Sequence, residues 1–234
     1  MHVATAARYL LQTVPLRLSD FEFEYPRELV ALDPAEPREE ARLMVVDREN
    51  GTLEHRSMQD LPDYFGPEDV LVANDTMVFP ARLFGTKERT DGRVEVFLLR
   101  ELNREHRLWD ALVEPARKVR VGNKLCFDGG LAAEVIDNTT SRGRTLRFLF
   151  EGTPEAFDDA VERVGSAPLP RYMVRRAEAA DKVRYQTVFA KHRGGVTAPA
   201  AGLHFTPELV DRIRARGASV CTVTLQTGLG SFRP

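Results

Sequence analysis

The sequence contains few of the residues that mark a disulfide-stabilised, zinc-binding or membrane-spanning protein. Its 234 residues include only two cysteines, Cys126 and Cys221, and neither belongs to a CxxC pair. We therefore expect no disulfide framework and no metal site, which is typical of a cytoplasmic protein, and we expect both cysteines to be small buried residues. No apolar run is long enough to span a bilayer. Residues 1–16 lack the basic start and apolar core of a secretory signal, so we interpret residues 1–17 as an N-terminal extension.

The sequence also lacks an overall excess of positive charge, because its net charge is -2 and its pI is about 6.2. Positive charge is instead concentrated in residues 171–193, which hold seven basic residues against two acidic ones. Such a segregated stretch suits phosphate binding, because cations near a nucleic-acid backbone release condensed counterions. A solvated charged loop would have the same composition. The candidate phosphate-binding residues are Arg171, Arg175, Arg176, Arg184, Lys191 and Arg193.

Residues 18–76 mix short strands and turns. The segments 43–47 and 52–56 flank Asn50-Gly51, which predicts a hairpin. A further apolar strand is expected at 70–73, followed directly by Asn74-Asp75. Polar residues in that position are often presented at the carboxyl edge of a sheet, where ligands bind.

Residues 78–152 have an all-β pattern. Five strand-like segments separated by turn signals suggest a small closed barrel. Trp109 and Phe127 lie inside such segments, so we assign both to the barrel core. The expected strands are 93–101, 108–114, 124–129, 131–137 and 144–152.

Residues 153–234 return to an α/β pattern. Thr153 and Thr206 are each followed by proline, as at the start of a helix, and Gly165 and Gly217 are expected to end the two helices. The second helix leads into residues 219–225, which we expect to form a buried strand, and then into a glycine-containing loop. This order of elements is typical of a sheet that binds ligands at its strand ends.

Three segments combine small, polar and glycine residues. In the first, Asn74-Asp75-Thr76 precedes Arg82, and Asp75 either binds a ribose hydroxyl or amine, or caps a turn or pairs with Arg82. The second, 197–206, ends at a helix N-terminus that favours anions, and its His204 is either a general acid or base or a structural residue. The third, 226–234, holds a GxG pattern and Arg233, a candidate anion ligand.

Together these segments resemble a known family. The strings VLVANDTMVFPARLFG, RYQTVFAK, APAAGLHFTPELV and VTLQTGLGSFRP, preceded by LRLSDFEFEYPRELVALDPAEPREEARLMVVDR, occur in the order found in the S-adenosylmethionine:tRNA ribosyltransferase-isomerases of queuosine biosynthesis. The resemblance covers residues 18–234. It implies an α/β class of fold with two domains: a sheet domain built from 18–77 and 153–234, and a six-stranded β-barrel inserted at 78–152.

The resemblance also implies the chemistry. Family enzymes transfer and isomerise the ribosyl group of S-adenosylmethionine onto 7-aminomethyl-7-deazaguanine in tRNAs with GUN anticodons, which gives epoxyqueuosine and releases adenine and methionine. S-adenosylmethionine is then a co-substrate, no metal or further cofactor is expected, and we expect a monomer. On this basis Asp75 and His204 are the candidate catalytic residues, and the basic residues of 171–193 would contact tRNA. The candidate substrate-binding residues are Asn74, Thr76, Arg82, Tyr185, Gln186, Thr197, Pro199, Gly202, Phe205, Thr206, Gln226, Gly228, Gly230 and Arg233.

The chain departs from the family pattern at several positions. Met77 stands where arginine is usual, Ala200 where threonine is usual, and Gln226-Thr227 where His-Val is usual; Ala116 replaces a glycine. Glutamine cannot act as a base at neutral pH, so a second reading is a non-catalytic relative that binds tRNA or a nucleoside. A third is an RNA-binding barrel module without an S-adenosylmethionine site. Family members continue beyond the last motif, so we expect the α/β domain to be incomplete.

Overall fold

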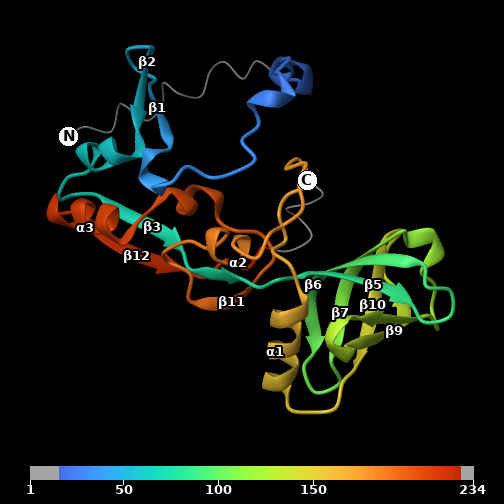
Figure 1. The fold of residues 1–234 in the computed structure, drawn as a ribbon. Helices are drawn as coiled ribbons and strands as arrows, with labels where there is room; N and C mark the ends of the chain where they lie inside the picture. Colours follow the sequence, from blue (N-terminus) through green and yellow to red (C-terminus); the bar gives the residue numbers. More distant parts are fainter. Residues whose placement is uncertain (1–15, 228–234) are drawn as a thin grey trace, which may run out of the picture. The chain divides into compact units, whose positions relative to one another are not determined.

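The computed structural model describes residues 16–227 and falls into two compact units, residues 1–31 and 32–234 (Figure 1). The described part of the first unit, residues 16–31, is built of two 3₁₀ turns, η1 (Leu18–Phe21) and η2 (Arg27–Leu29). None of the residues 16–31 is buried, and Leu18 and Phe23 are among its most exposed apolar side chains.

The second unit begins with the predicted hairpin, which is confirmed. Strand β1 (Arg42–Asp47) pairs antiparallel with β2 (Thr52–Ser57) around the Asn50-Gly51 turn, and Gly51 has a φ of 68°. A 3₁₀ turn, η3 (Arg38–Glu40), precedes the hairpin, and η4 (Met58–Tyr64) follows it. The Ser57 side chain accepts from the amide of Gln59 and so caps η4.

Six antiparallel strands close into the predicted barrel, in the order β10-β7-β6-β5-β8-β9. Alternation of apolar residues explains the packing, because Val96, Leu98 and Trp109 point into a core where each is at most 3% exposed. Phe127 is also buried, so both aromatic assignments to the core are confirmed. The strands are β5 (Arg82–Lys87), β6 (Arg93–Asn103), β7 (Leu108–Glu114), β8 (Lys124–Phe127), β9 (Ala132–Asn138) and β10 (Gly143–Leu149), with the 3₁₀ turns η5 (Ala116–Lys118) and η6 (Asp128–Gly130).

Helix α1 (Pro154–Val164) covers one side of the barrel (Figure 1). It begins where predicted, because the Thr153 hydroxyl accepts from the amide of Ala156 at 3.2 Å. Phe157 is 1% exposed and its ring lies 5.0 Å from that of Phe148, so this face of the helix completes the barrel core.

Two parallel strand pairs form the rest of the second unit. Strand β3 (Val70–Asn74) pairs with β12 (Ser219–Val223), and β4 (Thr76–Val78) pairs with β11 (His192–Gly195). Helix α3 (Pro207–Ala215), capped by Thr206, packs its apolar face with Met58 and Phe205. The short helix α2 (Asp181–Arg184) and the 3₁₀ turn η7 (Ala200–His204) complete this region.

The expectation that residues 219–225 form a buried strand is wrong. Strand β12 ends at Val223, and of its five residues only Val220 is partly buried. Val220 joins the cluster that includes Leu209 and Ile213 of α3, whereas Cys221 lies on the other face and is exposed. Cys126 is half-buried, so neither cysteine is the fully buried residue that we expected. No helix within residues 16–227 is long and apolar enough to cross a bilayer.

Candidate functional site

The candidate site is centred on Asp75, where one extended segment changes its strand partner. Before this residue β3 pairs with β12, and after it β4 pairs with β11. At the junction the Asp75 amide donates to the Val223 carbonyl at 3.0 Å, and the Asp75 carbonyl accepts from the amides of Lys191 (2.8 Å) and His192 (3.1 Å). Ligands of α/β sheets bind at such switch points, outside the carboxyl ends of the strands.

The Asp75 side chain is buried and is held as a carboxylate. Its Oδ1 accepts from the Thr224 hydroxyl at 2.6 Å, and its Oδ2 lies 3.9 Å from Nε2 of His192. The Thr224 hydrogen bond is the main cause that lowers the pKa of Asp75, and it outweighs the opposing effect of burial. A side-chain hydrogen bond from Thr222 lowers the pKa further, so Asp75 presents a negative charge.

Asn74 ties the end of β3 to the segment that follows β12. Its Oδ1 accepts from the amides of Thr76 (3.1 Å) and Leu225 (3.0 Å), and its Nδ2 donates to the Leu225 carbonyl at 2.9 Å. These three bonds occupy the Asn74 amide group, which gives the residue a positioning role. The first motif is thereby joined to Leu225, the residue directly before the third motif.

The second motif is joined to the third through Thr197 and Thr227. The Thr227 hydroxyl accepts from the Thr197 amide at 3.1 Å and donates to the Thr197 carbonyl at 3.0 Å. All three motifs thus meet within one region. Within residues 16–227, the buried hydroxyls of Thr76 and Thr197 have no hydrogen-bond partner.

Tyr185 and Gln186 of the RYQT segment contact β4 and the second motif. Both the oxygen and the nitrogen of the Gln186 amide bond the backbone of Val78, with 3.0 Å from the Val78 amide to Oε1. Burial raises the pKa of Tyr185, and the backbone of Ala198 bonds its hydroxyl. The two residues therefore connect β4 to the second motif.

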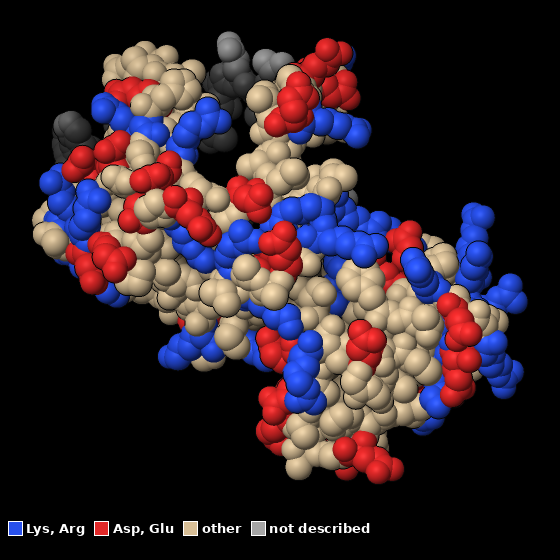
Figure 2. All heavy atoms as spheres, in the orientation of Figure 1, with Lys and Arg blue, Asp and Glu red and all other residues tan. Residues whose placement is uncertain are grey.

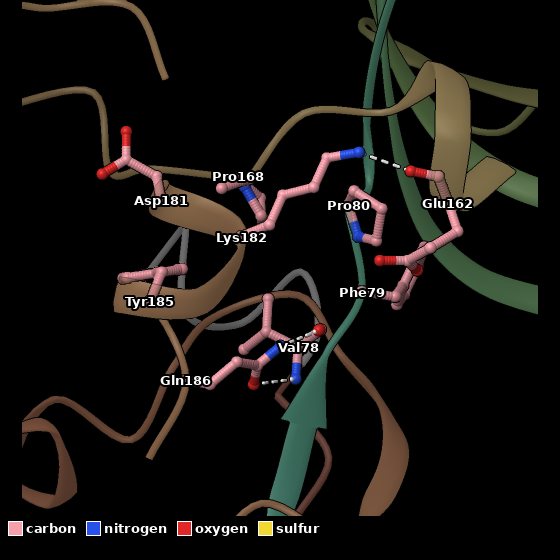
Figure 3. A pocket seen from close by; sticks show the side chains of 10 residues that line it. Val78, Phe79, Pro80, Glu162, Pro168, Asp181, Lys182, Tyr185 and Gln186 are labelled. Atoms are coloured by element: carbon pink, nitrogen blue, oxygen red, sulfur yellow. Dashed lines mark hydrogen bonds between the residues drawn. The ribbon is translucent and has the colours of Figure 1, made fainter. Parts of the chain in front are cut away.

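Tyr185 and Gln186 also line a small hollow of about 10 Å³, room for about one water molecule, that is partly open to solvent (Figure 3). Lys182 extends across the hollow and donates to the Glu162 carbonyl, as Figure 3 shows. The lining residues are Val78, Phe79, Pro80, Glu162, Ala167, Pro168, Asp181, Lys182, Tyr185 and Gln186.

The helix start after the second motif offers little to an anion. The Thr206 hydroxyl accepts a hydrogen bond from the Leu209 amide at 3.1 Å, Pro207 has no amide hydrogen, and Glu208 adds a negative charge. Phe205 is 7% exposed and packs edge-on against Phe189, which gives it a packing role.

The structure also defines the surroundings of His204 and Gly202 in the second motif. His204 is exposed at the end of η7, so its imidazole is accessible. Gly202 donates its amide to the Pro199 carbonyl at 2.8 Å. A side chain at Gly202 would bring Cβ within 2.9 Å of Thr187, so the close approach of these segments requires glycine.

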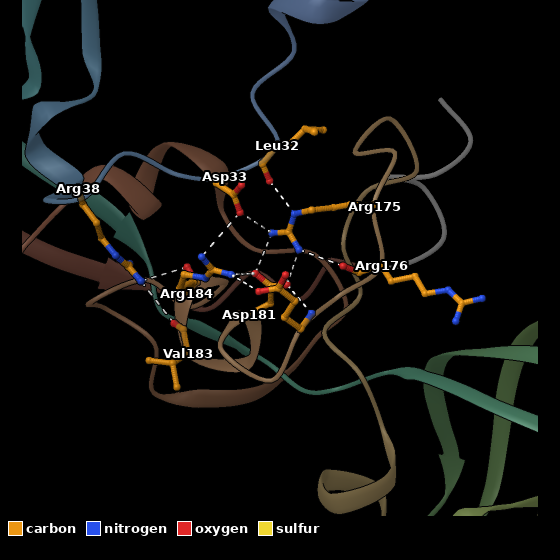
Figure 4. Close-up of polar contacts among 9 residues, drawn as sticks. Leu32, Asp33, Arg38, Arg175, Arg176, Asp181, Val183 and Arg184 are labelled. Carbon is orange, nitrogen blue, oxygen red and sulfur yellow. Dashed lines mark hydrogen bonds and ion pairs between the residues drawn. The ribbon is translucent and has the colours of Figure 1, made fainter.

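A network of arginines around Asp181 fixes this region (Figure 4). Arg175 binds the Asp181 carboxylate through two bonds of 2.6 and 2.9 Å, and Arg184 binds it at 3.1 Å. The side-chain hydrogen bond of Arg175 is the main cause that lowers the pKa of Asp181, to about 2. Arg175 also donates to the Leu32 carbonyl at 2.8 Å. These two arginines are engaged within the protein.

Arg38 is a member of the site that sequence reasoning missed. Its guanidinium donates to the carbonyls of Gln186 (2.6 Å) and Arg184 (3.0 Å), with a longer contact to Leu203 at 3.4 Å. It thus neutralises the carbonyl end of α2 and holds the RYQT segment beside η7. An arginine between proline and two glutamates has the pattern of an exposed charge, so no sequence signal indicated this role.

Comparisons with known proteins show which family the chain belongs to. A family model described as queuosine biosynthesis protein matches residues 18–234. The chain belongs to this family. It is 56% identical over 219 residues to an S-adenosylmethionine:tRNA ribosyltransferase-isomerase of Cytophaga hutchinsonii (93% of this chain, 63% of that protein). A protein of the same name from Flavobacterium psychrophilum is 56% identical over 221 residues (94% and 63%).

A solved structure is also similar to this member of the queuosine biosynthesis family. It is the S-adenosylmethionine tRNA ribosyltransferase of Thermotoga maritima, 30% identical, with a TM-score of 0.36, covering 90% of this chain and 59% of that one. The chain spans about 63% of the length of the curated relatives that it matches.

The remaining candidate residues of this queuosine-family chain are placed as follows. Arg82 pairs with Glu95 of the barrel and donates to the Leu169 carbonyl at 3.2 Å, so the alternative of an Asp75–Arg82 pair is wrong. Arg193 lies 4.6 Å from the Phe79 ring centre and 3.4 Å from Asp158.

Three basic candidates remain at the surface of the second unit. Arg171 pairs with Glu114 at 2.8 Å but stays 59% exposed. Arg176 and Lys191 are also exposed, and Figure 4 shows Arg176 directed away from the arginine network. These three cations remain accessible to a partner.

Gln226 stands at the position where the family pattern has histidine. Its Nε2 donates to the Arg193 carbonyl at 3.3 Å, and its amide lies where a side chain at Gly194 would be, 2.4 Å from an added Cβ. Gln226 is therefore held against β11, whose first residue, His192, bonds the Asp75 carbonyl. The candidates Gly228, Gly230 and Arg233 lie outside the described residues.

Proposed function

We propose that this chain forms the S-adenosylmethionine and tRNA site of a ribosyltransferase-isomerase of queuosine biosynthesis. The reaction would transfer and isomerise the ribosyl group of S-adenosylmethionine onto 7-aminomethyl-7-deazaguanine in tRNA with a GUN anticodon, giving epoxyqueuosine, adenine and methionine. The observation that carries the proposal is the chain of hydrogen bonds that links Asn74 to Leu225 and Thr227 to Thr197, beside Asp75, in a chain 56% identical to relatives of that name.

The charged and polar groups around Asp75 fit that chemistry. The Asp75 carboxylate would accept a hydrogen bond from a ribose hydroxyl, and its negative charge would favour a nearby sulfonium. The attacking amine must lose a proton as the new C–N bond forms and methionine leaves. His204, which is accessible on η7, is the proposed acceptor.

The half-buried ring of Tyr185 is the proposed stacking surface for the substrate base. It lines the hollow of Figure 3 together with Pro168, whereas Phe205 is buried in the core. A base taken out of the tRNA stack is commonly held by an aromatic ring in this way. The proposal therefore places the base next to Gln186 and close to β4.

Adenine release tests this proposal. The purified protein is incubated with S-adenosylmethionine and tRNA that carries the 7-aminomethyl-7-deazaguanine base, and adenine is followed by chromatography. Adenine that appears only with both substrates supports the proposal, and H204A should then lower the rate at least tenfold. Absence of turnover and of saturable S-adenosylmethionine binding would contradict it.

Gln226 favours a second candidate function, a non-catalytic relative that binds tRNA or a nucleoside. Its amide is occupied by the Arg193 carbonyl, and glutamine cannot remove a proton. Binding of both substrates without adenine release would support this candidate. The variant Q226H, which restores the usual histidine, should then gain turnover, whereas Q59H on the exposed side of η4 should not.

A further inference from the structure

We infer that the barrel loop 116–120 binds the phosphate backbone of RNA, together with Arg142 and Arg171. This inference rests on the proposed function, because it assigns a surface to the tRNA. The surface lies outside 171–193, apart from Arg171. We call these five residues, Arg117, Lys118, Arg120, Arg142 and Arg171, the loop cluster.

The cations of the loop are exposed and free of internal partners. The side chains of Arg117, Lys118 and Arg120 make no hydrogen bond or ion pair with any residue in 16–227. This distinguishes them from Arg175 and Arg184, which bind Asp181. Figure 2 shows Lys and Arg side chains gathered over loops of the barrel and along the segment that links α1 to α2.

The backbone of the loop is held rigid from inside the barrel. Arg144, only 6% exposed, donates to the carbonyls of Ala116 (2.6 Å) and Val119 (2.9 Å), and Lys87 donates to that of Lys118 at 3.1 Å. Val119 is 0% exposed and anchors the loop in the core. The carbonyls of Ala116 and Val119 are therefore bound by a buried side chain, while the charged side chains of the loop are exposed. A surface that is already ordered loses less entropy when it binds.

Glu114 connects the loop to the rest of the cluster. Its carboxylate binds Arg142 at 2.9 Å and Arg171 at 2.8 Å, and these two arginines, with Arg171 the larger contributor, lower the pKa of Glu114. Glu114 thus pairs with two of the five cations, and the other three have no acidic partner within residues 16–227, so the cluster keeps a net positive charge. Phosphate is the partner that such an excess of guanidinium and ammonium groups favours.

The cluster leads toward the hollow beside Tyr185. Arg171 lies three residues after Pro168, which lines the hollow, and Arg82 holds the Leu169 carbonyl between them. An RNA backbone on the cluster would therefore bring its nucleotides toward the proposed base site. This continuity favours RNA over a free phosphate or a nucleotide as the occupant.

The test compares two double variants with the same change of charge. R117E/K118E removes two free cations of the loop, and R214E/R216E removes two exposed cations of α3 and its C-terminal end, outside the cluster. Binding of fluorescently labelled tRNA is measured by anisotropy from about 50 to 200 mM salt. Thermal unfolding of each variant verifies that it is folded, and the milder R117Q/K118Q serves if the first variant does not fold.

We expect R117E/K118E to weaken tRNA binding at least tenfold and R214E/R216E to change it less than threefold. The slope of log K against log salt should fall in magnitude by about 1.4 to 1.8, since each lost phosphate contact contributes about 0.7 to 0.9. Equal affinities for both variants would overturn the inference while leaving the proposed function intact. A wild-type protein that binds no tRNA would overturn both. If inorganic phosphate competes with tRNA at micromolar concentration, the site binds a small anion, and the inference of an RNA backbone is overturned.

Discussion

The β-barrel and the strand pairs around Asp75 are stabilised in different ways. In the barrel, six strands close on themselves, and side chains such as Val96 and Leu98 are completely buried. Around Asp75 the strands within residues 16–227 form two-stranded pairs, and apolar residues such as Val70 and Val72 are more than half exposed. That region is held by side chains that bond distant backbone groups, chiefly those of Asn74, Gln186 and Arg38.

This difference suits the barrel to the role of a scaffold and the strand pairs to the role of a binding site. Apolar burial is non-directional and tolerates changes in position, so it suits a scaffold. Hydrogen bonds fix distance and angle, so the polar clamps at Asn74 and Gln186 suit a site that must align several motifs. The comparison predicts that core mutations will affect global stability and that clamp mutations will act locally.

The largest expected effect is in the barrel core. Phe157→Ala removes a ring that is 1% exposed and contacts Phe148 and Phe150, so the free energy of unfolding should fall by about 3 to 5 kcal/mol. Phe84→Ala, at a site 51% exposed on β5, is the matched control and should cost less than about 1 kcal/mol. Urea unfolding measures both values, and equal losses would contradict the description of the core.

A smaller effect is expected at Asp181. Since its pKa is lowered from 3.8 to about 2 in the folded state, the folded protein binds this proton less readily than the unfolded chain. The resulting stability is present above about pH 4 and is lost as the pH falls from about 4 toward 2, amounting to about 2 kcal/mol. Unfolding free energies measured across this range should show a weaker pH dependence for D181N than for the wild type.

The control for this prediction is D211N, because Asp211 is 72% exposed on α3. Its pH profile should follow that of the wild type. If D181N also follows the wild type, the arginine network does not contribute to stability as described.

The smallest effect is expected at Asn74. Asn74→Ala removes three hydrogen bonds to Thr76 and Leu225 and should cost about 1 to 2 kcal/mol, mostly as local opening. Hydrogen exchange should accelerate at the Thr76 and Leu225 amides and remain unchanged in the barrel. Asn138→Ala, at an exposed position, is the control. Unchanged exchange at both amides would show that Asn74 is not a clamp.

Much of the fold could be predicted because it follows from local pattern. Alternating residues gave the barrel strands, and the proline after Thr153 and after Thr206 indicated both helix starts. The exposure of β12 could not be predicted, because its composition is apolar while its burial depends on what packs against each face. Cys221 is exposed for that reason.

The candidate site could be predicted only in part. The family resemblance grouped the three motifs in one site, and the structure links Asn74 to Leu225 and Thr197 to Thr227. The individual roles depend on long-range contacts that no pattern encodes. Arg38 reaches Gln186 across 148 positions of the sequence, and Arg175 is neutralised by Asp181, so similar arginines have different roles.

Titration with S-adenosylmethionine tests the claim that the Asp75 carboxylate, at the strand switch, forms the binding site. Calorimetry compares the wild type with D75N, which keeps the shape of the side chain and removes its charge. D137N, at an exposed position on β9, is the control. We expect saturable binding by the wild type and D137N, and at least tenfold weaker binding by a folded D75N. Wild-type affinity in D75N would contradict the claim.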